Sequence, residues 1–320
     1  MEPRVDVRPV TDTNAADLVH HDGAAATPPK RRRWQTLIML IGLVAIAVAA
    51  ISTVGDASDE ALPGPGALGA AFFFVVTSLI LVARAWATLF PATVDRQVLT
   101  TRFYASQLTK YLPGGGFVQA ASQVALSEPA TGLGSAALRL PVFSLCTAAA
   151  GATLGAGLMF ASSLPVWARV LAGLGLVAPL LLDRRVLSFV LRAAQRFVRR
   201  LPDSDALPPQ RAILRCYAFS LGNMAAYAAA FALLLGDVTD VNPVIAAVAM
   251  STAWVAGYAF VISPSGLGVR EAILIGALPG LPTGPLLAAS LAQRLLGIVA
   301  EAGVAGVSRA WLALGRRRAT

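Results

Sequence analysis

The sequence predicts an all-α, polytopic transmembrane helix bundle with about eight membrane segments. Of its 320 residues, 56% are hydrophobic and 13% are charged, whereas soluble domains carry roughly a quarter charged residues. Several stretches without internal charge reach the roughly 20 apolar residues that a helix needs to cross a hydrocarbon core about 30 Å thick. A third observation, the unequal charge of alternate loops, orients the bundle.

Three regions are predicted along the chain. Residues 1–33 mix Pro, Asp, Thr, Ala and Arg without an apolar period and are expected to form a disordered cytoplasmic tail. This tail ends in the basic run Lys30–Arg33, followed by the interfacial aromatic residue Trp34. Residues 34–312 are expected to form the transmembrane domain, and residues 313–320 a basic cytoplasmic tail.

Apolar length defines the membrane segments. They are residues 34–54, 68–90, 138–160, 166–182, 212–235, 243–262, 267–278 and 285–307. The seventh is short, and the sequence leaves open whether it crosses the membrane or re-enters. The loops predicted to lie outside hold Asp56, Asp59, Glu60, Asp237 and Asp240 and no Lys or Arg, whereas the inner loops are basic. This asymmetry predicts that both termini are cytoplasmic.

Residues 185–201, in the central basic loop, are expected to form an amphipathic helix in the membrane interface. At 100° per residue, its arginines gather on one face and its apolar residues on the other. Arginines placed this way attract anionic lipid headgroups, or they act only as determinants of topology. Both interpretations stay open.

Composition also excludes some classes of function. The net charge of +9 does not indicate nucleic-acid binding, because the basic residues lie in short blocks beside apolar segments. The two histidines, His20 and His21, lie in the polar tail, so no metal site or cofactor is predicted in the membrane. The two cysteines, Cys146 and Cys216, fall in apolar segments and predict no disulfide framework.

An internal repeat is the most informative feature of the sequence. The stretch Pro113–Ala121 aligns with Pro264–Ala272 at the Pro, at the Gly two positions later, at the Val and at the final Ala. Each copy precedes an apolar segment that contains an Arg-Leu pair, at Arg139 and at Arg294. Repeats with broken helices at their interface are typical of transporter folds.

Pro and paired Gly residues interrupt a membrane helix, because Pro removes a backbone donor and Gly weakens helical packing. Broken backbone at membrane depth requires neighbouring protein or water, so both Pro-Gly elements are expected to line a cavity or a re-entrant turn. A helix starting after each turn would direct its N-terminal amides toward an anion such as a phosphate. The alternative interpretation is a pair of ordinary loops.

Charged residues inside membrane segments are the natural functional candidates. These are Arg139, Arg270, Glu271, Arg294 and Glu301. Arg294 and Glu301 are seven residues apart, on nearly the same helical face, and could form an ion pair. The alternative is a purely structural pair in which Glu271 or Glu301 neutralises Arg294. Other polar and aromatic residues of the apolar segments, Asn223, Tyr227, Trp254 and Tyr258, are expected to pack or to hydrogen-bond between helices.

Three motifs resemble the signatures of the lysylphosphatidylglycerol synthase transmembrane-region family, also called flippase-like domain proteins. They are Leu112–Gly114, Ser263–Ala272 and Gln293–Leu296. The resemblance covers roughly residues 34 to 312. It implies a multi-pass protein of the bacterial plasma membrane that binds or translocates an anionic phospholipid or a lipid-linked glycan.

The headgroup site that this hypothesis predicts consists of Arg270, Glu271, Arg294, Arg139, Gly266, Gly268, Pro113 and Gly115. The alternative function is an accessory subunit that presents lipid to a separate membrane glycosyltransferase or aminoacyl transferase. A synthase activity is not expected, because the soluble stretches of the sequence are shorter than a domain of about 50 residues. A membrane-embedded lipid enzyme that uses Glu271 or Glu301 as acid or base is the third hypothesis.

Overall fold

The computed structural model describes residues 62–111, 115–197, 204–259 and 268–318, and every regular element in these ranges is helical. This result confirms the predicted all-α class. In chain order the elements are α2 (Pro65–Thr88), α3 (Arg96–Gln107), η2 (Leu108–Tyr111), α4 (Gly115–Thr131), α5 (Leu133–Gly155), η3 (Ala156–Phe160), α6 (Val166–Gly173), η4 (Leu174–Leu182), α7 (Arg184–Gln195), η5 (Ser204–Ala206), α8 (Gln210–Val238), α9 (Pro243–Ala259), α10 (Val269–Ala277) and α11 (Thr283–Arg318).

Four helical stretches in the described ranges are long and apolar enough to cross a membrane. They are α2, Leu133–Phe160 (α5 continued by η3), α8 and Thr283–Trp311 within α11. The α6–η4 segment, taken together with α7, could supply a fifth. The predicted count of eight is not confirmed, because residues 34–54 lie outside the described ranges and the remaining segments are shorter.

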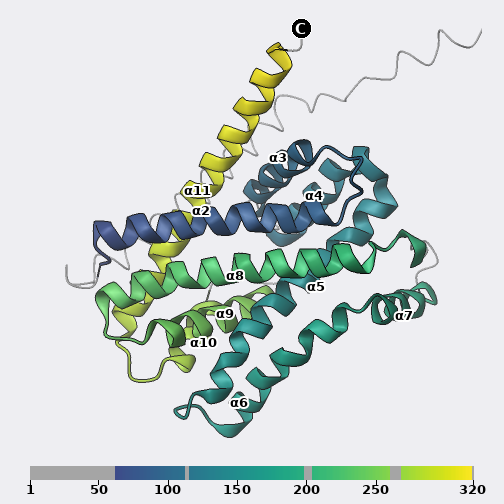
Figure 1. Cartoon of the computed structure of the whole chain (residues 1–320). Helices are drawn as coiled ribbons and strands as arrows, with labels where there is room; N and C mark the ends of the chain where they lie inside the picture. The colour runs from purple at the N-terminus through teal and green to yellow at the C-terminus, as the bar shows by residue number, and fades with distance from the viewer. Residues whose placement is uncertain (1–61, 112–114, 198–203, 260–267, 319–320) are drawn as a thin grey trace, which may run out of the picture.

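The predicted seventh segment, residues 267–278, corresponds to α10, which has nine residues. Nine residues rise about 14 Å, roughly half of the hydrocarbon thickness. This helix therefore cannot cross by itself. It packs against α9, which is apolar but has only 17 residues, and Figure 1 shows the two short helices together beneath α8. Such packing of two short helices is typical of a re-entrant pair.

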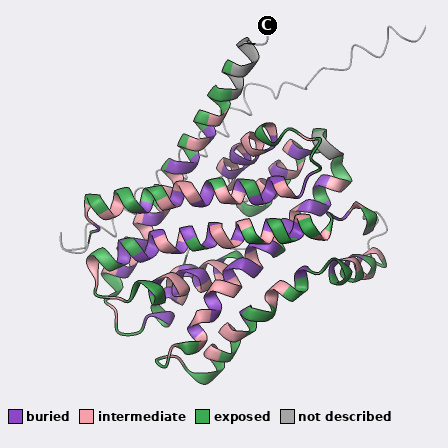
Figure 2. Ribbon diagram, viewed as in Figure 1, coloured by how far each residue is buried: buried purple, intermediate pink, exposed green. Residues whose placement is uncertain are grey.

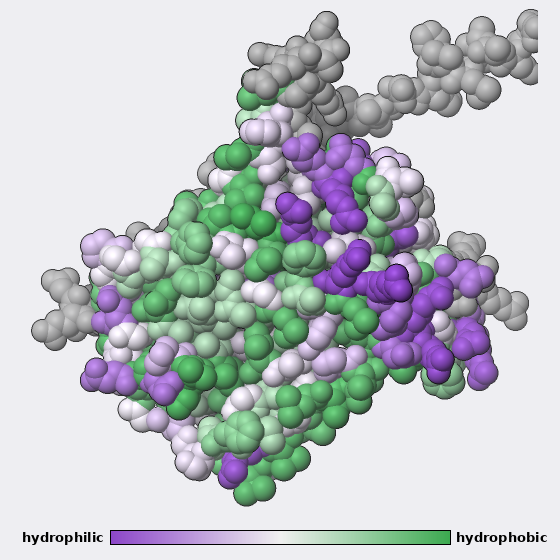
Figure 3. Space-filling view, viewed as in Figure 1, coloured by the Kyte–Doolittle hydropathy of each residue, from purple (hydrophilic) through white to green (hydrophobic). Residues whose placement is uncertain are grey.

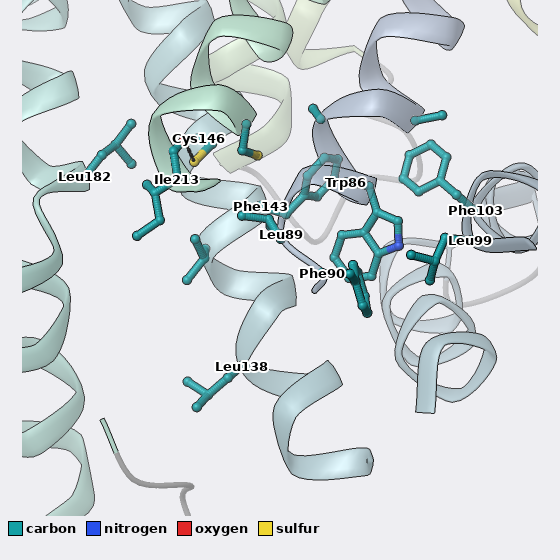
Figure 4. Packing of buried hydrophobic residues seen from close by; sticks show 14 of the residues in the cluster. Trp86, Leu89, Phe90, Leu99, Phe103, Leu138, Phe143, Cys146, Leu182 and Ile213 are labelled. Atoms are coloured by element: carbon teal, nitrogen blue, oxygen red, sulfur yellow. Dashed lines mark hydrogen bonds between the residues drawn. The ribbon is translucent and has the colours of Figure 1, made fainter. Parts of the chain in front are cut away.

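Two hydrophobic clusters hold the bundle together. The first gathers aromatic side chains near the C-terminal end of α2, where the Trp86 ring meets Phe90 and Phe143 edge to face, with centroids 5.1 and 5.4 Å apart. Figure 4 shows Trp86 in this cluster, with Phe90, Phe103 and Phe143 around it. The second cluster is rich in alanine and joins α2, α8, α9, α10 and α11.

Helices α5 and α9 approach each other closely through small residues four positions apart. A Cβ atom added at Gly151 would lie 2.6 Å from Val255 Cγ2, and one added at Gly155 would lie 2.6 Å from Thr252 Oγ1. Small residues at this spacing let membrane helices pack backbone to backbone. The two helices are thereby held in tight contact.

The surface is that of a membrane-embedded bundle. Figure 3 shows hydrophobic residues across the middle of one face, with hydrophilic residues gathered at the two ends of the bundle. The α6–η4 segment exposes many apolar side chains: α6 has no buried residue, and Trp167, Leu174 and Leu180 are exposed. Figure 2 shows the mostly exposed and intermediate residues of this segment. The integral membrane assignment is confirmed by the apolar spanning helices.

We expect the two cysteines to report folding. Cys146 on α5 and Cys216 on α8 are completely buried, and the Cys146 thiol donates to the Ile213 carbonyl at 3.7 Å (Figure 4). A thiol-reactive fluorogenic maleimide should therefore stay unreacted in folded, detergent-solubilised protein and label both cysteines as the protein is heated through its unfolding midpoint. Rapid labelling at low temperature would contradict the packing of α5 against α8.

Candidate functional site

The second Pro-Gly element precedes α10 in the chain, and the start of this helix carries three of the eight predicted site residues. Gly268 precedes the helix with φ +82°, a left-handed conformation that favours glycine. Arg270 and Glu271 follow in the first turn. Gly266 and, in the first element, Pro113 lie outside the described residues, and Gly115 is the first residue of α4.

The Glu271 carboxylate joins α10 to α11. Its Oε1 accepts from Arg294 Nη2 at 2.7 Å and from Ser290 Oγ at 3.1 Å, and its Oε2 accepts from the Gly268 backbone N–H at 2.9 Å. The negative group that the α10 N-terminus attracts is therefore the protein's own carboxylate. Of the two structural partners considered for Arg294, the geometry selects Glu271.

Arg270 is held from the other side by Tyr227 of α8. Its Nη1 donates to the Tyr227 hydroxyl at 2.9 Å, and its guanidinium carbon lies 5.6 Å from the centre of the Tyr227 ring. Gln293 Nε2 donates to the Tyr227 backbone carbonyl at 2.5 Å. Helices α8, α10 and α11 therefore meet at one tyrosine.

This cluster has more hydrogen-bond donors than the described protein groups satisfy. Arg270 Nε and Arg294 Nε are buried N–H groups for which this part of the chain supplies no acceptor, and Gln293 Oε1 is a buried acceptor without a donor. Arg270 and Arg294 also repel each other electrostatically. Two arginines against one glutamate leave a net charge of +1. An anion with several acceptor oxygens matches the unsatisfied guanidinium donors.

The cluster lies near the middle of the spanning helices. Gly297 is the midpoint of the candidate span Thr283–Trp311, and Arg294 precedes it by three residues. Tyr227 follows the midpoint of α8 by three residues. Three residues correspond to about 5 Å along a helix. Transporter binding sites formed by broken helices lie at this depth.

Helix α11 links this cluster to the first Pro-Gly element. Lys110, at the end of η2, forms an ion pair with the buried Glu301 of α11. Glu301 lies seven residues after Arg294, about 10 Å along the helix. The sequence spacing predicted a pair between Arg294 and Glu301, whereas the structure gives each residue a different partner. One face of α11 therefore contacts residues beside both broken elements.

Arg139, the repeat counterpart of Arg294, occupies a different setting. It is buried, its Nε donates to the Leu89 carbonyl at 2.9 Å, and its guanidinium lies 5.0 Å from the centre of the Phe90 ring. It also hydrogen-bonds Ser135. These contacts place Arg139 at the C-terminal end of α2, where a cation stabilises the helix dipole. They do not place it beside Arg270 and Arg294.

Several residues of the cluster were not among the predicted site residues. Tyr227 was expected to hydrogen-bond between helices, and it does so with the central arginine. Lys110 and Ser290 have no sequence signal that marks them as site residues, because a lysine in a basic inner loop is typical of a topology determinant. Gln293 stands directly before Arg294 in the third motif, so its position offered a signal for the site.

The described residues contain no group of three or more His, Cys, Asp or Glu side chains arranged to hold a metal ion. The cluster is chemically suited to electrostatic recognition of an oxyanion by guanidinium groups.

Comparison with known families supports the motif analysis. The family model described as lysylphosphatidylglycerol synthase TM region matches residues 103–302. The match includes η2, both Pro-Gly elements, α10 and the Arg294 to Glu301 stretch of α11. No curated protein matches the chain.

We expect the Glu271–Arg294 pair to stabilise the bundle. Arg294→Gln leaves Glu271 half-buried without its cation, so the thermal midpoint in the thiol-labelling measurement should fall by roughly 5 °C. The double variant E271Q/R294Q, which removes both charges, should fall by less than R294Q alone. Strictly additive losses from E271Q and R294Q would show that the two residues are not coupled.

Arg139 should behave as a cap for α2. Arg139→Lys keeps the charge but removes the planar guanidinium that reaches the Leu89 carbonyl and covers Phe90. We expect the thermal midpoint to fall by about 3 °C, corresponding to a lost charge-assisted hydrogen bond. An unchanged midpoint would argue that only the charge of Arg139 matters, as for a residue that attracts lipid.

Proposed function

The chain belongs to the lysylphosphatidylglycerol synthase TM region family, and on this premise we propose that it binds an anionic lipid headgroup inside the bundle and moves it across the membrane. The headgroup belongs to an anionic phospholipid or a lipid-linked glycan. Its phosphate contacts Arg270 and Arg294, while its acyl chains stay in the bilayer. The membrane is the bacterial plasma membrane, with both termini in the cytoplasm.

The observation that carries this proposal is the pair of buried, unsatisfied guanidinium donors, Arg270 Nε and Arg294 Nε. Burying a charged donor without an acceptor is costly. A phosphate oxygen supplies the missing acceptors and neutralises the excess positive charge. Such donors in a membrane segment indicate a ligand more specifically than a fully paired ion cluster would.

Neighbouring residues orient the two arginines. Glu271 is already occupied by three donors and, as an anion, repels phosphate, so its role is to hold Arg294 in position. Tyr227 does the same for Arg270. With these partners, the buried Nε of each guanidinium is left as the unsatisfied donor.

Lys110 of η2, shortly before the first Pro-Gly element in the chain, offers another cation on the same face of α11. Its partner Glu301 lies about 10 Å along the helix from Arg294. A phosphate leaving the arginines can move along this face of α11 toward Lys110. The direction of movement is set by whichever leaflet the headgroup enters from.

The charge of Arg270 can be removed without breaking the Glu271–Arg294 pair. In proteoliposomes containing fluorescently labelled phosphatidylglycerol, we expect Arg270→Gln to slow translocation at least tenfold, because one charge-assisted hydrogen bond contributes about 1.5–3 kcal/mol. Arg270→Lys should retain part of the activity. Translocation is measured by quenching the label that remains in the outer leaflet.

Arg309→Gln is the matched control, since Arg309 is an exposed arginine on the same α11, and it should leave the rate unchanged. All variants need a thermal midpoint near that of the parent protein. Equal rates for the parent and R270Q would refute the headgroup site. Binding of the labelled lipid without translocation would instead favour presentation of lipid to a separate membrane enzyme.

A further inference from the structure

A sharp corner separates α7 from the apolar segment before it. The α6–η4 segment and α7 meet at an angle of 83°. Asp183 caps α7 by accepting from the Arg185 backbone N–H at 2.7 Å. Gln210 of α8 spans the corner, because it accepts from the Arg184 N–H at 2.7 Å and donates to the Leu182 carbonyl at 3.4 Å. The direction of α7 is therefore fixed relative to α8.

Helix α7 has three faces with different surroundings. Leu187 and Leu191 are buried and belong to the aromatic cluster. Val186 and Val190, which lie 40° apart around the helix, are 37% and 57% exposed although they are apolar. At 100° per residue, Arg185, Arg192 and Arg196 lie within 40° of one another and form the third face, with Phe189 at its edge. A helix that lies in the interface at the edge of a membrane protein contacts protein with one face, acyl chains with the second and headgroups with the third.

The basic face opens onto a hollow of about 720 Å³ lined by Asp183, Arg184, Arg185, Ser188, Arg192 and Gln210. Three arginines against one aspartate give its lining a net charge of +2. Figure 1 shows α7 at the end of the bundle where α8 begins, and Figure 3 shows hydrophilic residues gathered at that end. The hollow is therefore polar, positive and placed at the level of the interface.

We propose that α7 lies in one membrane interface and that its hollow holds the phosphate headgroups of anionic lipids of that leaflet. The α6–η4 segment is exposed and apolar and runs into the bilayer, so a helix at 83° to it lies nearly in the membrane plane. Val186 and Val190 then enter the acyl region while Arg185, Arg192 and Arg196 stay among the headgroups. This site is distinct from the cluster at Arg270 and Arg294 and does not depend on translocation.

The full chain is tested with a tryptophan reporter on the exposed apolar face, Val190→Trp, in bilayers of equal phosphatidylglycerol and phosphatidylcholine. Tryptophan fluorescence is measured while bromine, which quenches it, is carried on the acyl chains of one of the two lipids at a time. The fluorescence of the parent protein, which has five tryptophans of its own, is subtracted. We expect quenching by both brominated lipids, and stronger quenching by phosphatidylglycerol. Adding R185Q/R192Q should lower the preference for phosphatidylglycerol at least fivefold, since each arginine near a headgroup contributes about a factor of five.

The matched control is R211Q/R215Q, which removes two exposed arginines from the same end of α8 outside the hollow and should preserve the preference. A reporter that neither lipid quenches would place α7 in water and overturn the proposal. An unchanged preference in R185Q/R192Q, or an equal loss in R211Q/R215Q, would also overturn it. Inorganic phosphate added at constant ionic strength should have no effect, and loss of the preference would identify a site for free phosphate instead.

Discussion

The interaction between Glu271 and Arg294 supports the rest of the central site. A nine-residue helix is too short to be stable alone, and α10 is attached to α11 through this carboxylate. The same carboxylate closes the first turn of α10 on Gly268, which fixes the direction in which Arg270 leaves the helix. If the pair were absent, Arg294 would lose the carboxylate that positions it. The ion pair that offsets the free-energy cost of burying these charges therefore also sets the geometry of the site.

Much of the architecture follows from the sequence, because apolar length and charge asymmetry respond directly to the bilayer. The ends of α2, α5–η3 and α8 lie within about five residues of the predicted segments, whereas α11 continues to Arg318, beyond the predicted end at residue 307. The number of crossings was harder to predict, since a short apolar stretch such as residues 267–278 has the same composition whether it crosses or turns back. Only its packing against α9 distinguishes these cases.

The predicted site was recovered in part. Arg270, Glu271 and Arg294 lie together, as broken-helix motifs and intramembrane charge suggested. The partners of Arg294 and Glu301 could not be deduced, because spacing on one helix says nothing about which neighbouring helix faces it. Arg139 shows the limit of the repeat argument, since an arginine at the same place in a repeat binds a helix-terminal carbonyl at the end of α2, away from the cluster of Arg270 and Arg294.

The close contact of α5 with α9 has a mechanical consequence. With glycine at positions 151 and 155, the Val255 and Thr252 side chains of α9 pack directly against the backbone of α5. They behave as a single stiff unit. A larger side chain at either position would push the two backbones apart, so α5 and α9 are expected to move together in any rearrangement of the bundle.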